Sequence, residues 1–168
     1  LVNTEEVYIY NARINTTLSG NSNAILIKNT GAGSDHKNHK IYNSELNVYG
    51  AQSSGIEITG FNAGVSNSII EDTSIYSDQY YGVRVNGGTS GSGNINITRS
   101  NIMSNLQNRY AVFLEDSEIS FIRDSNLSTI SDSDIKISGG THNLINTTYI
   151  DETVSGQFMN IFGPFLTF

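Results

Sequence analysis

The 168-residue sequence has no cysteine and no tryptophan, and its only proline is Pro164. Without cysteine the chain has neither a disulfide framework nor a thiolate metal site. Charged residues make up only 15%, and 16 acidic against 9 basic residues give a net charge of −7. Because lysine and arginine form no run that would neutralise a line of phosphates, nucleic acid and anionic membrane surfaces are not expected partners.

Long apolar runs are also missing: none approaches the roughly 18 residues that cross a bilayer, so membrane insertion is not expected. Disorder requires few aromatic and β-branched residues, whereas this chain has 9 Tyr, 7 Phe and many Ile. The chain begins at Leu1 without a signal-peptide pattern, so either a leader has been removed or this is a piece of something longer. Abundant Asn, Ser and Thr with little Lys favour an extracellular or cell-surface location.

Two short phrases alternate along the chain, exemplified by IEDTSI at residues 70–75 and GVRVNG at 82–87. Six copies of the first phrase begin at Ile9, Ile41, Ile70, Ile97, Ile122 and Ile145. Their separation shrinks from 32 to 23 residues. The second phrase returns at residues 24–29, 55–60, 111–116, 134–139 and, more loosely, 158–163.

The apolar residues of these phrases alternate at i and i+2, as in Val83 and Val85, which is the pattern of a strand. No segment has a sustained helical period. A unit of 23 to 32 residues cannot bury its own apolar face, whereas stacked coils bury a continuous interior. We therefore predict an all-β fold, a single-stranded parallel β-helix of about six coils without obvious caps, forming one domain over residues 1–168.

The alternation also predicts which side chains face inward: Ile25, Ile27, Ile56, Ile58, Val83, Val85, Val112, Leu114, Ile135, Ile137, Met159 and Ile161. An outward ladder lies between them: Leu26, Glu57, Arg84, Phe113, Lys136 and Asn160. Glu57 and Arg84 should therefore be neighbours. In the first phrase, the residues at i and i+5 should face inward. The short residue at i+3 should form the tight corner: Ala12, Ser44, Thr73, Ser100, Ser125 and Thr148.

Six copies of Ile-x-(Asn/Asp)-(Ser/Thr)-x-(Ile/Leu), each followed by Gly-apolar-x-apolar-x-Gly, resemble the coils of right-handed parallel β-helix proteins of the pectate-lyase-like superfamily. They are especially similar to NosD-type surface repeats and to the shafts of phage tailspikes. The resemblance covers residues 7–163 and implies a right-handed coil. It implies no single activity, because that superfamily includes lyases, hydrolases, epimerases, adhesins and inert scaffolds.

Position i+2 of the first phrase forms a polar column: Asn11, Asn43, Asp72, Arg99, Asp124 and Thr147. Asp72, Arg99 and Asp124 resemble the cluster of polysaccharide lyases in which carboxylates hold Ca²⁺ and an arginine abstracts a proton. They are the candidate catalytic residues, although Arg99 would compete for the oxygens that Ca²⁺ needs. The alternative is a corner ladder that satisfies turn backbone, with Arg99 neutralising its neighbours. Apart from this Ca²⁺, no cofactor or metal is expected.

Two further sets of polar residues have a chemical and a structural interpretation. Four acidic residues lie in adjacent turns: Glu115, Asp116, Asp132 and Asp134. They would suit glycoside hydrolysis, or they are ordinary turn residues. His36 and His39, beside Asp35, are either half of a metal site or part of an exposed loop.

Aromatic residues and sequons suggest surface contacts. Six aromatic residues either form a sugar-stacking surface or cover neighbouring coils: Tyr42, Tyr49, Tyr76, Tyr80, Tyr81 and Phe113. Four sequons are expected to point outward, as glycosylation requires, although their number is what chance would give: Asn15, Asn96, Asn126 and Asn146.

The ends of the chain favour an assembly hypothesis. A β-helix exposes an unpaired coil at each end, and Pro164 should stop regular pairing before an apolar tail of Phe165, Leu166 and Phe168. Either the chain is excised from a longer solenoid or its ends bury against another copy, and a head-to-tail contact builds an open filament.

Three functions follow from these observations. The first is a secreted structural module that assembles with copies of itself into a sheath, filament, surface layer or fibre shaft. The second is a polysaccharide lyase or hydrolase domain, such as a tailspike fragment. The third is carbohydrate binding without turnover, through tyrosine and asparagine ladders.

Overall fold

The computed structural model describes residues 6–17, 20, 22–29, 36–60, 65–66, 68–86, 95–115, 119–130, 134–138, 141–145, 147, 152–155 and 159–162. Within these ranges the regular structure consists of strands alone. The described residues include no helix with the length and apolar character needed to cross a membrane.

The largest sheet, sheet 1, has seven parallel strands in the order β1-β5-β9-β12-β15-β18-β20. Its strands are β1 (Tyr8–Tyr10), β5 (Lys40–Tyr42), β9 (Ser68–Glu71), β12 (Ile95–Thr98), β15 (Ile119–Arg123), β18 (Thr141–Ile145) and β20 (Met159–Phe162). Each strand pairs with the strand of the preceding coil in parallel. The first phrase of the repeat therefore begins in sheet 1.

Two further parallel sheets complete each coil. Sheet 2 has five strands: β2 (Arg13–Thr16), β6 (Glu45–Val48), β10 (Ser74–Ser77), β13 (Asn101–Ser104) and β16 (Asn126–Thr129). Sheet 3 has six: β3 (Ile25–Asn29), β7 (Ile56–Gly60), β11 (Val83–Asn86), β14 (Val112–Glu115), β17 (Ile135–Ser138) and β19 (Glu152–Ser155). A small additional pair joins β4 (His36–Lys37) to β8 (Val65–Ser66).

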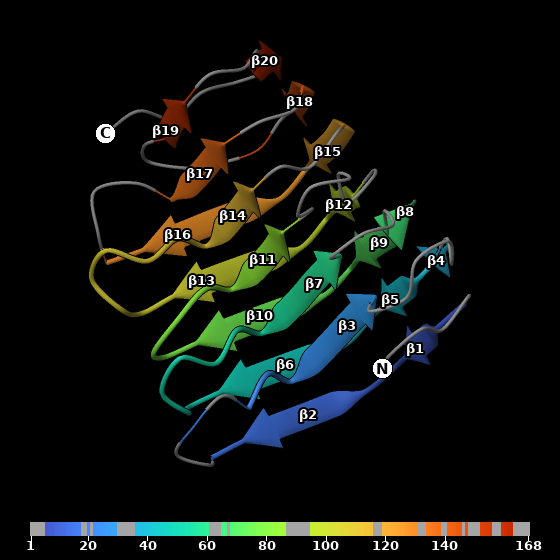
Figure 1. The fold of residues 1–168 in the computed structure, drawn as a ribbon, viewed down its shortest axis with the longest axis vertical. Coiled ribbons are helices and arrows are strands. Elements are labelled where there is room, and N and C mark those ends of the chain that lie inside the picture. Colours follow the sequence, from blue (N-terminus) through green and yellow to red (C-terminus); the bar gives the residue numbers. More distant parts are fainter. Residues whose placement is uncertain are drawn as a thin grey trace.

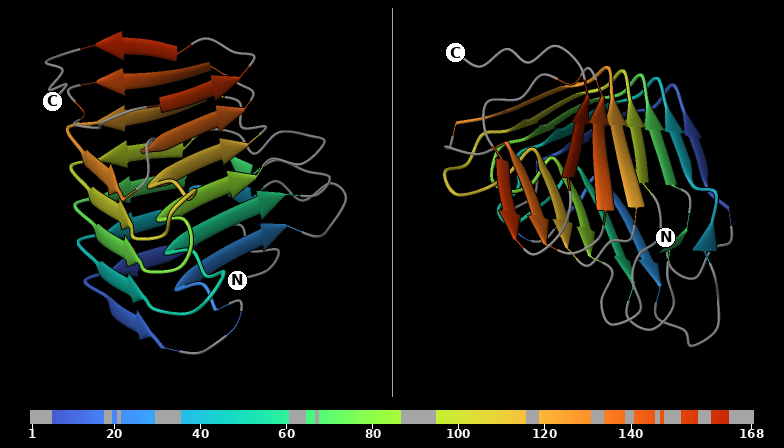
Figure 2. Two further views of the ribbon diagram at one scale, coloured as in Figure 1. Left: turned by 90° about the vertical axis from the view of Figure 1, so that its left-hand side faces the viewer. Right: turned by 90° about the horizontal axis from the view of Figure 1, so that it is seen from above.

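The predicted class, a single-stranded parallel β-helix, is confirmed. From β1 to β18 the chain passes from sheet 1 to sheet 2 to sheet 3 and then to the next level of sheet 1 (Figure 1). After β18 the next described strand, β19, belongs to sheet 3. Seen from above, it turns counter-clockwise as it rises toward the C-terminal end, which is the right-handed sense (Figure 2). Within the described residues the three sheets contain seven, five and six strands, so the number of stacked levels, predicted as about six, differs from sheet to sheet.

The interior is built from the apolar positions that the alternation predicted. In sheet 1, Ile41, Ile70, Ile97 and Ile122 form one column, and none is more than 2% exposed. All the predicted inward residues with described side chains, from Ile25 to Ile137, are buried. Alternation works here because successive side chains of a strand point to opposite faces of the sheet.

The strand Met159–Phe162 lies in a different sheet from the one predicted. Its sequence was assigned to the second phrase, but β20 pairs with β18 in sheet 1, and the unrecognised strand β19 extends sheet 3. Thr153, not Asn160, is therefore the register partner of Lys136. A short alternating strand fits either sheet equally well, so the sequence pattern alone does not decide between them.

The corner between sheets 1 and 2 lies one residue earlier than predicted. Residue i+2, not i+3, adopts the left-handed conformation: φ is 51° at Asn11, 44° at Asn43, 49° at Asp72, 48° at Arg99 and 49° at Asp124. Asparagine and aspartate tolerate this conformation better than other non-glycine residues. Their dominance in the column therefore has a backbone cause.

The residue after the bend is small because it lies inside the corner, where its hydroxyl bridges successive coils. Ser100 Oγ donates to Thr98 O at 3.0 Å and accepts the Thr73 N–H at 3.2 Å. Ser125 Oγ makes the same pair of contacts, donating to Arg123 O at 2.8 Å and accepting from Ser100 N at 3.2 Å. These bonds satisfy backbone groups that the bend removes from the sheet ladders.

We predict that Ser100→Ala lowers the free energy of unfolding by about 1–3 kcal/mol, because it leaves the buried Thr73 N–H without its acceptor. Ser74→Ala is the matched control, since Ser74 is exposed on a neighbouring strand of sheet 2. Urea unfolding followed by circular dichroism measures both variants. Equal losses in the two would contradict the bridging role of the hydroxyl.

Candidate functional site

The candidate residues Asp72 and Arg99 meet at the corner between sheets 1 and 2. Arg99 Nε donates to Asp72 Oδ1 and Arg99 Nη2 donates to Asp72 Oδ2, each at 2.8 Å. Arg99 Nη2 also donates to the Glu71 carboxylate. One guanidinium therefore holds two carboxylates of the preceding coil, in the bidentate geometry that makes such pairs specific.

This pairing fixes the charge of both partners. Hydrogen bonds from Arg99 hold the pKa of Asp72 below its usual value. Hydrogen bonds to Asp72 and then to Glu71 raise the pKa of Arg99 above its ordinary value. A guanidinium stabilised in its charged form is a poor proton acceptor, so the geometry favours the corner ladder over proton abstraction.

Asp124 occupies the next corner position, as the spacing predicted. The Arg99 N–H donates to Arg123 O at 3.0 Å, which stacks the corner of Asp124 on that of Arg99. At the opposite end of the column, Asn43 Nδ2 donates to Asn11 Oδ1 at 2.8 Å. Thr147 departs from the pattern because the sixth copy was predicted one residue too late: Leu144, not Ile145, pairs with Ile122. Thr147 therefore takes the position after the bend, where it is buried and Oγ1 donates to Ile122 O at 3.1 Å.

Ca²⁺ was the one cofactor suggested by this column. In the part of the chain that the structure describes, no three or more His, Cys, Asp or Glu side chains are grouped so as to hold a metal ion. His39, which the sequence put either in a metal pair or in an exposed loop, is buried. The side chain of His36 lies outside the described residues, as does Asp35.

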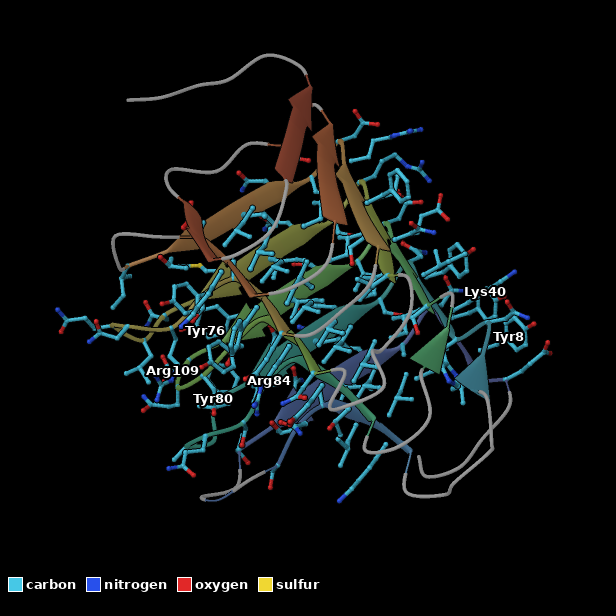
Figure 3. All side chains as sticks on the ribbon, turned by 45° about the horizontal axis from the view of Figure 1, so that its top comes forward. Tyr8, Lys40, Tyr76, Tyr80, Arg84 and Arg109 are labelled. Atoms are coloured by element: carbon cyan, nitrogen blue, oxygen red, sulfur yellow. The ribbon has the colours of Figure 1, made fainter. Side chains whose placement is uncertain are left out.

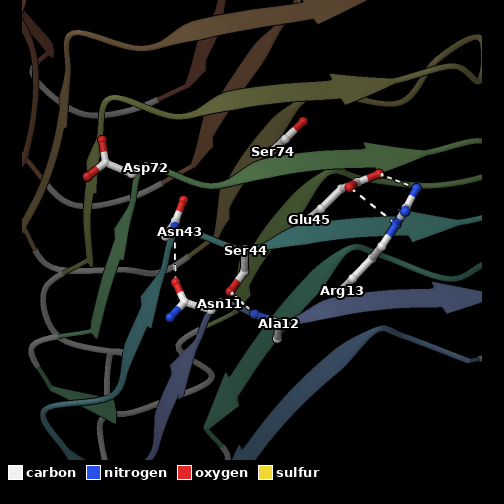
Figure 4. A pocket seen from close by; sticks show the side chains of 8 residues that line it. All are labelled: Asn11, Ala12, Arg13, Asn43, Ser44, Glu45, Asp72 and Ser74. Atoms are coloured by element: carbon white, nitrogen blue, oxygen red, sulfur yellow. Dashed lines mark hydrogen bonds and ion pairs between the residues drawn. The ribbon is translucent and has the colours of Figure 1, made fainter.

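A hollow of about 540 Å³ borders the same corner near the N-terminal end (Figure 4). It is lined by Asn11, Ala12, Arg13, Asn43, Ser44, Glu45, Asp72 and Ser74. Its polar side chains pair with one another: Arg13 Nε lies 3.3 Å from Glu45 Oε2, beside the Asn11–Asn43 bond. Four of the polar side chains that line the hollow therefore already bond to one another within it.

A second charged network lies on the outer face of sheet 3. Arg84 Nη1 is 3.2 Å from Glu57 Oε1, which confirms the predicted neighbours, and Arg84 Nη2 is 3.3 Å from Glu115 Oε2. Glu115 also accepts from Asn86 Nδ2 at 2.9 Å. Asp134 is buried where the chain enters β17. Asp116 and Asp132, the other two predicted carboxylates, lie outside the described residues.

The six predicted aromatic residues do not form one surface. Tyr81 packs against Tyr80, with ring centroids 4.3 Å apart, and against Phe113, at 5.1 Å. Tyr81 and Phe113 are each only 8% exposed. Arg84 lies 5.9 Å from both rings, and Arg109 lies 5.0 Å from the ring of Tyr80 (Figure 3). This group is a packed cluster outside the solenoid and offers little ring surface to a ligand.

Other tyrosines are more exposed. Tyr49, which follows β6, packs against Tyr76 of β10 with ring centroids 5.7 Å apart. On sheet 1, Tyr10 stacks on Tyr42 at 5.3 Å, and Tyr8 lies 6.1 Å from Tyr10. Tyr8 and Tyr10 are 46% and 54% exposed. The sequence interpretation did not single them out, although their alternation around Ile9 was a signal for outward placement.

The remaining candidates concern glycosylation and assembly. Asn15 and Asn126 are exposed, while Asn96 is half-buried on the outer face of sheet 1. Asn15 Oδ1 accepts from Asn47 Nδ2 at 3.0 Å. Asn146 and the tail residues Pro164, Phe165, Leu166 and Phe168 lie outside the described residues.

If the corner column is structural, asparagine should replace Arg99 better than alanine does. Both variants lose the ion pairs, but asparagine tolerates the positive φ of this position. We expect Arg99→Asn to unfold at a higher temperature than Arg99→Ala, as a thermal unfolding experiment would measure.

The loss of stability caused by Arg99→Ala should also depend on pH. The lowered pKa of Asp72 contributes stability that is present above its unfolded-state pKa and is lost as pH falls through its folded-state pKa. The difference between Arg99→Ala and the unchanged chain should therefore shrink in acid. A difference that stays constant or grows would contradict this assignment.

Comparison of the chain with protein-family models, curated proteins and solved structures found no match. The architecture itself supports the resemblance noted in the sequence, but only at the level of a parallel β-helix.

Proposed function

We propose that this chain is a structural β-helix module that assembles with copies of itself outside the cell or at its surface, as a sheath, filament, surface layer or fibre shaft. The observation behind this proposal is that apolar side chains of the first coil are incompletely buried. Ile9 and Ile14 are only partly buried, although Ile41 and Leu46, their partners in the next coil, are 2% and 0% exposed. A further coil stacked on this end would bury them.

The pairing of charged side chains between coils supports a structural role for the chain. Arg13, Arg84 and Arg99 each pair with a carboxylate of a neighbouring coil. Such pairs hold adjacent coils in register, and exposed ones add little stability. The repeated coil chemistry agrees with a relationship to pectate-lyase-like right-handed β-helices, which include inert scaffolds.

Light scattering after size-exclusion chromatography, with electron microscopy of the same fractions, tests the proposal. We expect oligomers or filaments whose size grows with protein concentration. Deleting residues 164–168, the apolar tail, should reduce assembly. A full-length chain that stays monomeric at all accessible concentrations would rule the proposal out.

Carbohydrate binding is a second candidate, favoured by a hollow of about 420 Å³ on the outer face of sheet 1. It is lined by Ile69, Glu71, Asn96, Thr98, Phe121 and Arg123. The exposed ring of Phe121 beside carboxylate, amide and hydroxyl groups is suited to a sugar, which has an apolar face and a hydroxylated rim.

A glycan array, repeated with Phe121→Ala, tests this candidate: binding that the substitution abolishes would support it. Release of product from an acidic or neutral polysaccharide, lost in Arg99→Ala, would instead identify the enzyme alternative based on Asp72, Arg99 and Asp124.

A further inference from the structure

We propose that copies of the chain join through sheet 1, with β20 of one copy pairing in parallel with β1 of the next. This inference rests on the proposed self-assembly and adds to it the strands, the polarity and the register of the contact. Its basis is that β1 and β20 are the two end strands of the seven-stranded order.

The backbone of β1 is prepared for a second parallel partner. The Lys40 N–H donates to Val7 O at 2.8 Å, and the Asn11 N–H donates to Tyr42 O at 3.1 Å. In a parallel strand the N–H and C=O of one residue point to the same side, and successive residues alternate between sides. The backbone groups of Tyr8 and Tyr10 therefore point away from β5, to the side where the described residues supply no strand.

The exposed rings of β1 contact side chains of β5. Lys40 Nζ lies 5.6 Å from the ring centroid of Tyr8, and Tyr42 stacks on Tyr10 with an interplanar angle of 3°. Lys40 and Tyr42 belong to β5, so each covers its ring from the same direction. Figure 3 shows Tyr8 and Lys40 together at this end of the molecule. Even so, Tyr8 and Tyr10 remain 46% and 54% exposed.

The register of sheet 1 supplies a matching strand at the other end. By Cα register one position of the seven strands is always aliphatic: Ile9, Ile41, Ile70, Ile97, Ile122, Leu144 and Ile161. In the same Cα register Tyr10 aligns with Phe162, and Tyr8 aligns with Asn160. Adding β1 of a second copy after β20 in the same register therefore aligns the Cα of Ile9 with that of Ile161 and the Cα of Tyr10 with that of Phe162.

The contact is heterologous, because one copy contributes β20 and the other β1. Since both end strands remain available at the ends of any assembly, the contact does not close, and it builds an open filament. The coil stack of one copy would continue into the next with the same parallel polarity.

Cysteine pairs provide the test, because the chain has no cysteine of its own. Single-cysteine variants are mixed in pairs under mild oxidation. Two pairs are in register, Tyr10→Cys with Phe162→Cys and Tyr8→Cys with Asn160→Cys. Adjacent strands lie about 4.8 Å apart, within the usual disulfide range. We expect both mixtures to give a disulfide-linked dimer of unlike copies. The second pair retains Tyr10, so the test does not depend on one variant.

Exchanging the partners gives matched controls: Tyr10→Cys with Asn160→Cys, and Tyr8→Cys with Phe162→Cys. These positions are diagonal, about 7–8 Å apart, so they should not cross-link efficiently. Oligomers in light scattering that cross-link no better in register than out of register would overturn the inference and leave self-assembly standing. A chain that is monomeric and does not cross-link would overturn both.

Discussion

Replacing Gly82 by valine is expected to lower the free energy of unfolding by about 3 kcal/mol, at the upper end of the range for overpacked interiors. A Cβ at Gly82 would lie 2.4 Å from Ile102 Cγ2 and 2.7 Å from Ala111 O. The backbone has little freedom to move away, because Gly82 O accepts the Ile56 N–H at 3.0 Å. Valine would therefore separate adjacent coils at the entry to sheet 3.

Ala111 provides the control for this prediction. It precedes β14 as Gly82 precedes β11, and it is fully buried with its methyl group accommodated. Ala111→Gly should cost about 1 kcal/mol or less, the usual backbone penalty of glycine. Guanidinium unfolding monitored by circular dichroism compares the two variants. If Gly82→Val were as mild as Ala111→Gly, the close approach of the coils would not be what requires glycine at this position.

Ile97→Ala is expected to cost about 2–5 kcal/mol, the range for truncating a large buried aliphatic side chain. Ile97 is 0% exposed and lies between Ile70 and Ile122 in the inward column of sheet 1. Since a solenoid is stabilised by contacts between neighbouring coils, a cavity at this level weakens the contacts on both sides.

Ile14→Ala is the comparison for the central truncation. Ile14 is only partly buried in the first coil, so an isolated chain should lose less stability than Ile97→Ala does. Urea unfolding at several protein concentrations measures both. If copies stack on the first coil, the loss of unfolding free energy caused by Ile14→Ala should grow with protein concentration. The loss caused by Ile97→Ala should stay constant. An Ile14→Ala loss as large as that of Ile97→Ala in dilute solution would contradict the open first coil.

The corner column was predicted in part by the sequence and in part only revealed by the structure. The repeat aligned Asp72, Arg99 and Asp124 on successive coils, and the structure brings Asp72 and Arg99 into contact. The sequence did not reveal that this position is the bend, because a positive φ leaves only a statistical preference for Asn and Asp. It also did not reveal that Glu71 shares the guanidinium, since Glu71 lies in the strand next to the corner.

The sequence by itself determined the parallel β-helix, the inward columns and the pairing of Glu57 with Arg84, because a two-residue alternation repeated coil after coil fixes which face each side chain takes. Only the tertiary structure decided what the turns cover and which sheet an ambiguous strand joins. Phe113 points outward as predicted yet is buried, because Tyr81 and Tyr110 from neighbouring turns pack against its ring. Met159–Phe162 joins sheet 1 because it pairs with β18 while β19 takes the next place in sheet 3, and a two-residue alternation suits either sheet.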